Sequence, residues 1–347
     1  MTSPVMAEAT PSLYSRRVTP VADARPIAAA TPCPVCLAAD VVPLYAIEAS
    51  TGRLVRCATC GTGRIDPLPD ADELAGYYST AYYGEAGRKF HWFFELLIRF
   101  IAARHLGFLA RRVPKGGRVL DIGCGRGTLL TGLADRGLEV HGTEISAAAA
   151  TGADPRAHIR IAPRLIDAGY PEAYFDQVIL WHVLEHLPDP RATLLEVRRI
   201  LRPGGEVIVA VPNFSSWQSR WAGPAWFHLD LPRHLYHFPC EALKALLADC
   251  GFAFRSEHHF SLRQNPFGWV QSWLNRRPSL PRNGLYELLL RQPRRAARPF
   301  SVFERSAFYA ALAGGLPVAL AIEIAATMCR QGATVHVVGV AADGDSG

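Results

Sequence analysis

Lysine is nearly absent from this sequence of 347 residues, since only three of its 37 basic residues are lysines. The net charge is a modest +6. Because arginine is accompanied by abundant alanine, we attribute this bias to genome composition and not to a nucleic-acid interface. The N-terminus also lacks a basic stretch followed by a long apolar core. The sequence therefore predicts no secretory signal and a cytoplasmic protein.

Residues 1–30 lack sustained hydrophobic periodicity and are rich in Ala, Pro, Thr and Ser. We expect them to form a disordered leader. The chain as a whole is 49% hydrophobic and 20% charged, which is typical of a globular protein with a sizeable core. Its length allows two structural units.

The eight cysteines do not indicate a disulfide framework, because four of them stand in two Cys-x-x-Cys pairs and four are scattered. The pairs are Cys33/Cys36 and Cys57/Cys60, and 20 residues separate them. Two such turns can surround Zn²⁺ with four thiolates, which leaves no open coordination position. We therefore predict a structural zinc ribbon over 31–68. Two unrelated pairs or a redox dithiol are the alternative.

The segment RVLDIGCGRG, residues 118–127, joins an expected apolar strand to an expected helix. Its loop contains Gly123, Gly125 and Gly127. Glycines permit a sharp turn and a close ligand approach, and a helix N-terminus favours an anion. The third glycine comes one residue too early for a pyrophosphate loop of the dehydrogenase type. Since Asp121 suits an ammonium group, a ligand with carboxylate, ammonium and adenosine parts is indicated, namely S-adenosylmethionine (SAM).

A second strand is expected over 138–145 and ends in Glu144, 17 residues beyond Gly127. An acid at this place can accept hydrogen bonds from both ribose hydroxyls of a nucleoside. The glycine loop and the acid together are stronger evidence than the loop alone. The alternative is a chance glycine turn, with Glu144 a solvated strand end.

Four segments carry a family resemblance: LDIGCGRG, HGTEIS, FDQVILWHVLEHLPDP and ILRPGGEVIVAVPN. In this order they resemble the successive motifs of class I SAM-dependent methyltransferases. The resemblance implies an α/β fold, a doubly wound, Rossmann-like sheet of seven strands whose last strand is antiparallel. It also implies that Asp121 and the glycine loop bind the methionine end of SAM and that Glu144 binds the ribose. Family members often carry an aspartate after the third strand that contacts adenine, but residues 161–166 read IAPRLI. We expect backbone and apolar contacts near Leu165 instead.

The expected fourth strand, 175–181, is followed directly by His182. A helix over 190–202 and a fifth strand over 206–211 come next. In an open parallel sheet, ligands bind beyond the carboxyl ends of the strands. We therefore expect His182 to lie where the transferable methyl group points.

The string His-x-x-Glu-His, residues 182–186, also matches an inverted zinc-protease pattern. That pattern needs a helix and a third ligand, whereas this string ends a strand. Some small-molecule and RNA O-methyltransferases are similar here but carry Glu-x-x-Glu-His and bind a divalent ion. Because His182 replaces the first glutamate, we expect Glu185 and His186 to have a conformational role at the turn.

The stretch 212–239 combines tryptophans, prolines and histidines, which favours a pocket lid. Zinc-ribbon sugar C-methyltransferases resemble this architecture and place a histidine near this point, and His234 is the nearest match. This resemblance implies that His234 accepts a proton during methyl transfer, as a histidine of near-neutral pKa can. The alternative is that His234 only braces the loop through Asp230 or a backbone group.

A helix over 240–250, a strand over 252–260 and a last strand over 334–340 continue the sheet pattern, with some 70 extra residues before the last strand. Within them, 306–328 is almost uncharged. Gly314, Gly315 and Pro317 interrupt this run, and a membrane span would separate the last strand from its sheet. We favour buried helices that cap the pocket or form a homodimer contact. A basic, peripheral membrane-surface patch is the alternative.

The sequence thus predicts six segments: 1–30 leader, 31–68 zinc ribbon, 69–112 helical linker, 113–260 methyltransferase core, 261–331 helical insertion, and 332–347 last strand and tail. By resemblance, the acceptor is a sugar nucleotide, a polysaccharide precursor or another small biosynthetic molecule, methylated on O, C or N. An RNA methyltransferase and a non-catalytic SAM-fold partner protein are the alternatives.

Overall fold

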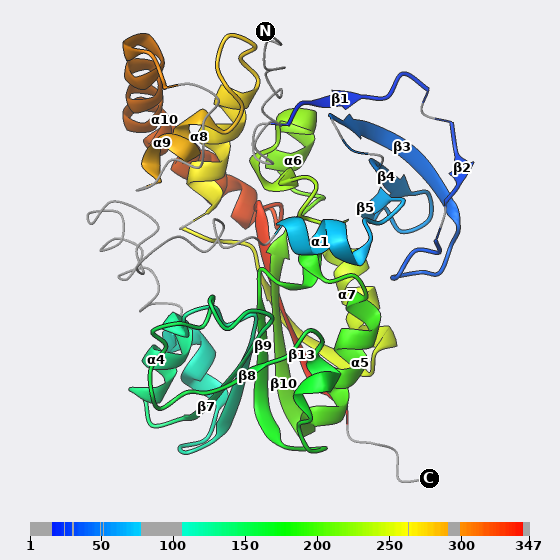
Figure 1. Ribbon diagram of the computed structural model, residues 1–347, viewed down its shortest axis with the longest axis vertical. Coiled ribbons are helices and arrows are strands. Elements are labelled where there is room, and N and C mark those ends of the chain that lie inside the picture. The colour runs from blue at the N-terminus through cyan, green and yellow to red at the C-terminus, as the bar shows by residue number, and fades with distance from the viewer. Residues whose placement is uncertain are drawn as a thin grey trace, which may run out of the picture.

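The computed structural model describes residues 16–77, 106–290 and 299–342, apart from Ala24, Ala30, Ala49, Thr51 and Arg263. Two sheets and a group of helices make up the described chain (Figure 1).

The larger sheet has seven strands in the order β12-β13-β10-β9-β6-β7-β8. Their bounds are β6 Arg118–Ile122, β7 Glu139–Glu144, β8 His158–Ile161, β9 Phe175–Trp181, β10 Leu201–Pro212, β12 Phe252–His258 and β13 Thr334–Ala341. Strand β13 is antiparallel to both of its neighbours, and the pairs from β10 to β8 are parallel. This order confirms the predicted doubly wound sheet with an antiparallel last strand.

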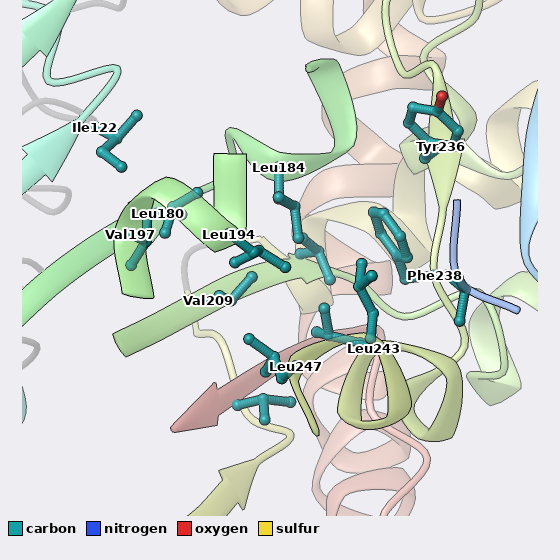
Figure 2. Close-up of a cluster of buried hydrophobic side chains, with 14 of the residues drawn as sticks. Ile122, Leu180, Leu184, Leu194, Val197, Val209, Tyr236, Phe238, Leu243 and Leu247 are labelled. Carbon is teal, nitrogen blue, oxygen red and sulfur yellow. The ribbon is translucent and has the colours of Figure 1, made fainter. Parts of the chain in front are cut away.

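Helices cover both faces of this sheet, so the middle of its central strands is mostly apolar. On one face, α5 (Pro190–Ile200) and α7 (Cys240–Asp249) place Leu194, Val197 and Leu243 against the strands (Figure 2). On the other, α4 (Thr128–Ala134) packs on β6 and β7. Helix α5 begins where Asp189 accepts a hydrogen bond from the Ala192 amide at 2.8 Å. These contacts fix the carboxyl ends of the strands, where a ligand would bind.

The smaller sheet contains the ribbon strands β3 (Asp40–Ile47), β4 (Arg53–Cys57) and β5 (Gly63–Asp66). Strand β11 (Tyr236–His237), which comes from the segment after β10, pairs with β5. A ribbon edge therefore carries part of the predicted pocket lid.

Two further strands, β1 (Val18–Pro20) and β2 (Ile27–Ala28), pair with β3. The predicted leader over 1–30 is therefore wrong for these residues, because strand β3 supplies backbone partners that the local sequence pattern does not reveal. Residues 1–15 lie outside the described residues. In the predicted linker, α1 (Ala71–Tyr77) and the short helix η2 (Ala110–Arg112) are described, while 78–105 are not.

The described residues between β12 and β13 form three α-helices: α8 (Asn265–Asn275), α9 (Gly284–Leu289) and α10 (Val302–Met328). They gather beyond one end of the larger sheet (Figure 1), and Trp269, Leu285 and Phe308 form their shared core. Helix α10 continues through Pro317, although this residue was expected to interrupt it. It was also expected to be buried, yet only 17% of its most apolar stretch is buried.

Candidate active site

The turn between β6 and α4 depends on its glycines. Gly123, Gly125 and Gly127 have φ values of +67°, +50° and +67°, a region that other residues rarely adopt. A Cβ on Gly123 would lie 2.7 Å from Cγ2 of Val183, so this glycine lets the segment after β9 approach the loop. A Cβ on Gly125 would meet no atom within 4 Å, which leaves the loop surface open to a ligand.

Two carboxylates lie beside this loop. Glu144, at the end of β7, accepts hydrogen bonds from the amides of Gly125 at 3.0 Å and Ile145 at 2.8 Å. Asp121, near the end of β6, is 5% exposed. Burial, together with the charge of Glu144, raises the pKa of Asp121 to about 8. The site therefore favours a ligand that brings a positive charge and hydroxyl donors.

The predicted adenine contact, Leu165, begins the short helix η3 (Leu165–Ala168) and is buried in the main hydrophobic core. Ile145 and Ile166, by contrast, are 52% and 57% exposed. Ile145 directly follows Glu144 and Ile166 follows Leu165, so each offers exposed apolar surface next to a predicted site residue. Sequence reasoning missed both, although the position after the acid was a usable signal.

His182 follows β9 directly and has an unusual backbone, with φ +54°. Its Nδ1 lies 3.1 Å from Oε1 of Glu185, in the short helix η4 (Leu184–His186). Within the described chain, Nε2 of His182 and Oε2 of Glu185 are buried without a hydrogen-bond partner. If Nδ1–H donates to the carboxylate, Nε2 keeps its lone pair and can accept a proton.

Three histidines of the lid, His228, His234 and His237, are buried. The Nδ1–H of His234 donates to the His228 carbonyl at 2.9 Å, and the Nε2–H of His237 donates to the Leu229 carbonyl at 3.0 Å. Burial lowers the pKa of His228 to about 3 and of His237 to about 4, and it holds the pKa of His234 well below its usual range. These rings are therefore neutral at pH 7.

His234 lies close to the string that begins at His182. Its ring centroid is 4.6 Å from that of His186, whose Nδ1–H donates to the Arg233 carbonyl at 3.0 Å. Metal-ligand atoms of Glu185, His186 and His234 lie within 4.8 Å of one another. Two imidazoles fixed through Nδ1 and one carboxylate can hold a divalent cation.

The structure brings the two predicted histidines, His182 and His234, to the same end of the sheet.

The four paired cysteines converge in the ribbon. Sγ of Cys33 lies 3.6 Å from Sγ of Cys60, and Sγ of Cys36 lies 3.5 Å from Sγ of Cys57. All four sulfur atoms lie within 4.8 Å of one another. With Zn–S bonds of about 2.3 Å, a tetrahedral site separates its sulfurs by about 3.8 Å. The cluster is therefore compatible with a zinc ribbon.

Backbone hydrogen bonds connect this ribbon to the site. The Ile65 amide of β5 donates to the Leu235 carbonyl at 3.0 Å, and the Leu235 amide donates to the Glu185 carbonyl at 2.9 Å. Arg191 of α5 donates to the carbonyls of Pro34 and Val35, in the first cysteine turn, at 2.9 and 2.7 Å. The ribbon therefore helps to position both the lid and the turn after β9.

A sheet of this order, with a glycine turn after one central strand and an acid at the end of the next, is the arrangement of the class I SAM-dependent methyltransferases, and the chain carries a methyltransferase domain with this sheet. A family model described as a methyltransferase domain matches residues 93–257.

Curated relatives are similar over part of the chain. It is 40% identical over 106 residues to a ubiquinone biosynthesis O-methyltransferase of Alkalilimnicola ehrlichii, which covers 28% of this chain and 43% of the relative. The protein of the same name from Maricaulis maris is 32% identical over 145 residues, covering 39% and 56%. The chain thus spans about half the length of these relatives. A solved SAM-dependent methyltransferase from Archaeoglobus fulgidus is 18% identical, with a TM-score of 0.43 over 71% of this chain and 93% of that one.

Proposed function

We propose that this chain transfers the methyl group of SAM to a hydroxyl group of a small biosynthetic acceptor. Candidate acceptors are a sugar nucleotide, a polysaccharide precursor or another metabolite. The observation that carries the proposal is the His182–Glu185 pair. Nε2 of His182 has no partner in the described chain, and the next residue, Val183, lies against the glycine loop. The printed activity of the relatives, O-methylation, supports a hydroxyl acceptor.

The donor is held on the β6–β7 side of the site. The turn of Gly123, Gly125 and Gly127 brings backbone amides to the methionine carboxylate, and Asp121 faces its ammonium group. Glu144 accepts hydrogen bonds from the ribose hydroxyls. Apolar surface near Leu165, together with the exposed Ile145 side chain, contacts adenine.

The acceptor hydroxyl binds between this donor and His182. As the acceptor oxygen bonds to the methyl carbon, the carbon–sulfur bond breaks and S-adenosylhomocysteine leaves. The hydroxyl proton passes to Nε2 of His182, and the carboxylate of Glu185 stabilises the imidazolium through its bond to Nδ1. Because the reacting atoms are held in line, positioning contributes much of the rate enhancement.

His234 is the second predicted proton acceptor. Burial lowers its pKa, which makes it a weaker base than an ordinary histidine. Its Nδ1 bond to the His228 carbonyl instead holds the lid against His186. We assign it to the positioning of the lid and of the acceptor.

The ribbon completes the proposal. Zn²⁺ bound by Cys33, Cys36, Cys57 and Cys60 would have no open position, so it is structural. Its role is to stabilise the strands on which β11 lies.

The test begins with labelled SAM and a panel of sugar nucleotides, phenols and RNA, to find an acceptor. His182→Gln should then lower kcat by about 10²- to 10⁴-fold, with SAM affinity unchanged. His158→Gln, at an exposed position of β8, is the matched control. Full turnover by His182→Gln would refute the assignment. Activity that is lost on chelation while the ribbon keeps its zinc, and is regained with Mg²⁺, would assign proton removal to a metal held by Glu185, His186 and His234 instead.

A further inference from the structure

Helix α10 exposes an apolar surface that a soluble helix would normally bury. It has 27 residues and a mean hydropathy of 1.7 in its most apolar stretch. Val302, Phe303 and Val318 are 82%, 74% and 60% exposed, and Met328 is 81% exposed. Exposed apolar surface of this extent marks a site of interaction.

The acids of this region all point inward. Residues 261–331 contain three glutamates, no aspartate and no lysine. Glu287, Glu304 and Glu323 are at most 4% exposed. The outward surface of the described helices therefore carries no carboxylate.

The basic charge of the chain is concentrated in the same segment. Ten arginines and three glutamates give residues 261–331 a net charge of +7, whereas the whole chain has +6 and the rest therefore −1. Arg276, Arg277 and Arg305 are exposed. These three exposed arginines complement an anionic partner.

Tryptophans border the apolar surface next to these arginines. The guanidinium of Arg276 lies 4.8 Å from the ring centre of Trp221, and that of Arg277 lies 4.5 Å from the ring centre of Trp273. Both tryptophans are about two-fifths exposed, at 41% and 42%. They line an apolar groove of about 1160 Å³ between α8, α10 and α6 (Trp217–Ala222). Amphipathic rings and basic groups at the edge of an apolar surface are typical of the interface of a lipid bilayer.

The second half of α10 is anchored to the protein, so the helix does not cross a bilayer. The carboxylate of Glu323 accepts hydrogen bonds from Asn265 at 2.7 Å, Trp269 at 2.8 Å and the Ala333 amide at 3.0 Å. The chain then enters β13, inside the larger sheet (Figure 1). Only the outward side of α10 is available to a partner.

We propose that the outward side of α8 and α10 docks on the surface of an anionic lipid bilayer. The apolar side chains of α10 enter the acyl boundary, and Arg276, Arg277 and Arg305 pair with lipid phosphates. Helix α8 also contacts the lid, because a Cβ on Gly268 would lie 2.7 Å from Nε2 of His228. Docking therefore brings the lid close to the membrane surface.

The test is co-sedimentation of the full chain with vesicles of phosphatidylcholine alone or with about 40% phosphatidylglycerol. No donor or acceptor is present, so the result is independent of the proposed reaction. We expect binding to the anionic vesicles that falls with added salt. Arg276→Gln with Arg277→Gln should weaken it about 25-fold, at about fivefold for each arginine. Arg53→Gln with Arg56→Gln, exposed on β4, is the matched control.

A second pair of variants tests the apolar contact. Phe303→Ser with Val318→Ser should weaken vesicle binding at least tenfold, whereas Leu195→Ser on α5, 51% exposed, should leave it unchanged. Near-ultraviolet circular dichroism and SAM affinity confirm that each variant is folded. Unchanged binding by the Phe303/Val318 pair, or no binding by the wild type, would overturn the proposal. A wild-type dimer that this pair makes monomeric, without vesicle binding, would identify a contact between copies instead. If only detergent released the protein from the vesicles, α10 would be an integral membrane segment.

Discussion

Donor binding should release a proton from Asp121. This side chain is buried next to Glu144, and its pKa is raised to about 8 in the ligand-free site. An acid with a raised pKa is protonated at pH 7 and gives up its proton when a cation takes the place beside it. The ammonium group of SAM is the cation that we place there. The perturbation is Asp121→Asn, which keeps the shape and removes the titration.

The size of the effect follows from this pKa. At pH 7 about nine tenths of Asp121 carries a proton, so forming its carboxylate in the complex releases about 0.9 proton. The amino group of the ligand, with a pKa of about 7.7–8.0, takes up about 0.1. The net release is about 0.8 proton. Affinity should therefore rise with pH below the pKa of Asp121, by about fivefold between pH 6.5 and 7.5.

Titration calorimetry at pH 7 in two buffers of different ionisation enthalpy measures this release directly. The wild type should release about 0.8 proton and Asp121→Asn should take up about 0.1. Equal values for the two proteins would refute the placement of the ammonium group. A release near zero in the wild type would show that Asp121 keeps its proton in the complex.

The remaining predictions concern the zinc ribbon and the stability of the folded protein. Metal analysis should find one zinc per chain. A chelator, or Cys36→Ser, should remove the zinc and lower methyl transfer at least tenfold, because β5 supports β11. A zinc-free protein with full activity would contradict this prediction. Glu323→Leu should lower the free energy of unfolding by about 3–6 kcal/mol in urea titrations, because it leaves the buried Asn265, Trp269 and Ala333 donors unpaired. Glu323→Gln, which keeps one acceptor oxygen, should cost less, and equal losses would contradict the hydrogen-bond argument.

The core of the fold could be predicted from the sequence because its signals are local. The apolar run before Gly123 predicts β6, and the run before His182 predicts β9, each with the bounds that the structure has. Strands buried on both faces show as continuous apolar segments. Glu144 could be placed because it follows the glycine loop at the spacing expected for the end of the next strand.

The short strands could not be predicted in this way. Strands β1, β2 and β11 have two or three residues and exist because β3 and β5 offer backbone partners far away in the sequence. Pairing of this kind depends on tertiary context more than on residue preference. Helix α10 also differs from the prediction, because it continues through Pro317 and packs on α8.

The chemistry at His182 illustrates the same limit. Its position at a strand end follows from the sequence, but its left-handed backbone and its bond to Glu185 do not. Such a conformation is set by the surrounding structure.

The pairing of β11 with β5 has a consequence for how such proteins change over generations. The ribbon supplies an edge on which a segment of the methyltransferase lid is laid, so the two parts are not interchangeable modules. If the ribbon were lost in evolution, β11 of the lid would lose its backbone partners at the same time. Conversely, a change in β5 can move β11, and with it the lid, without any change in the glycine loop.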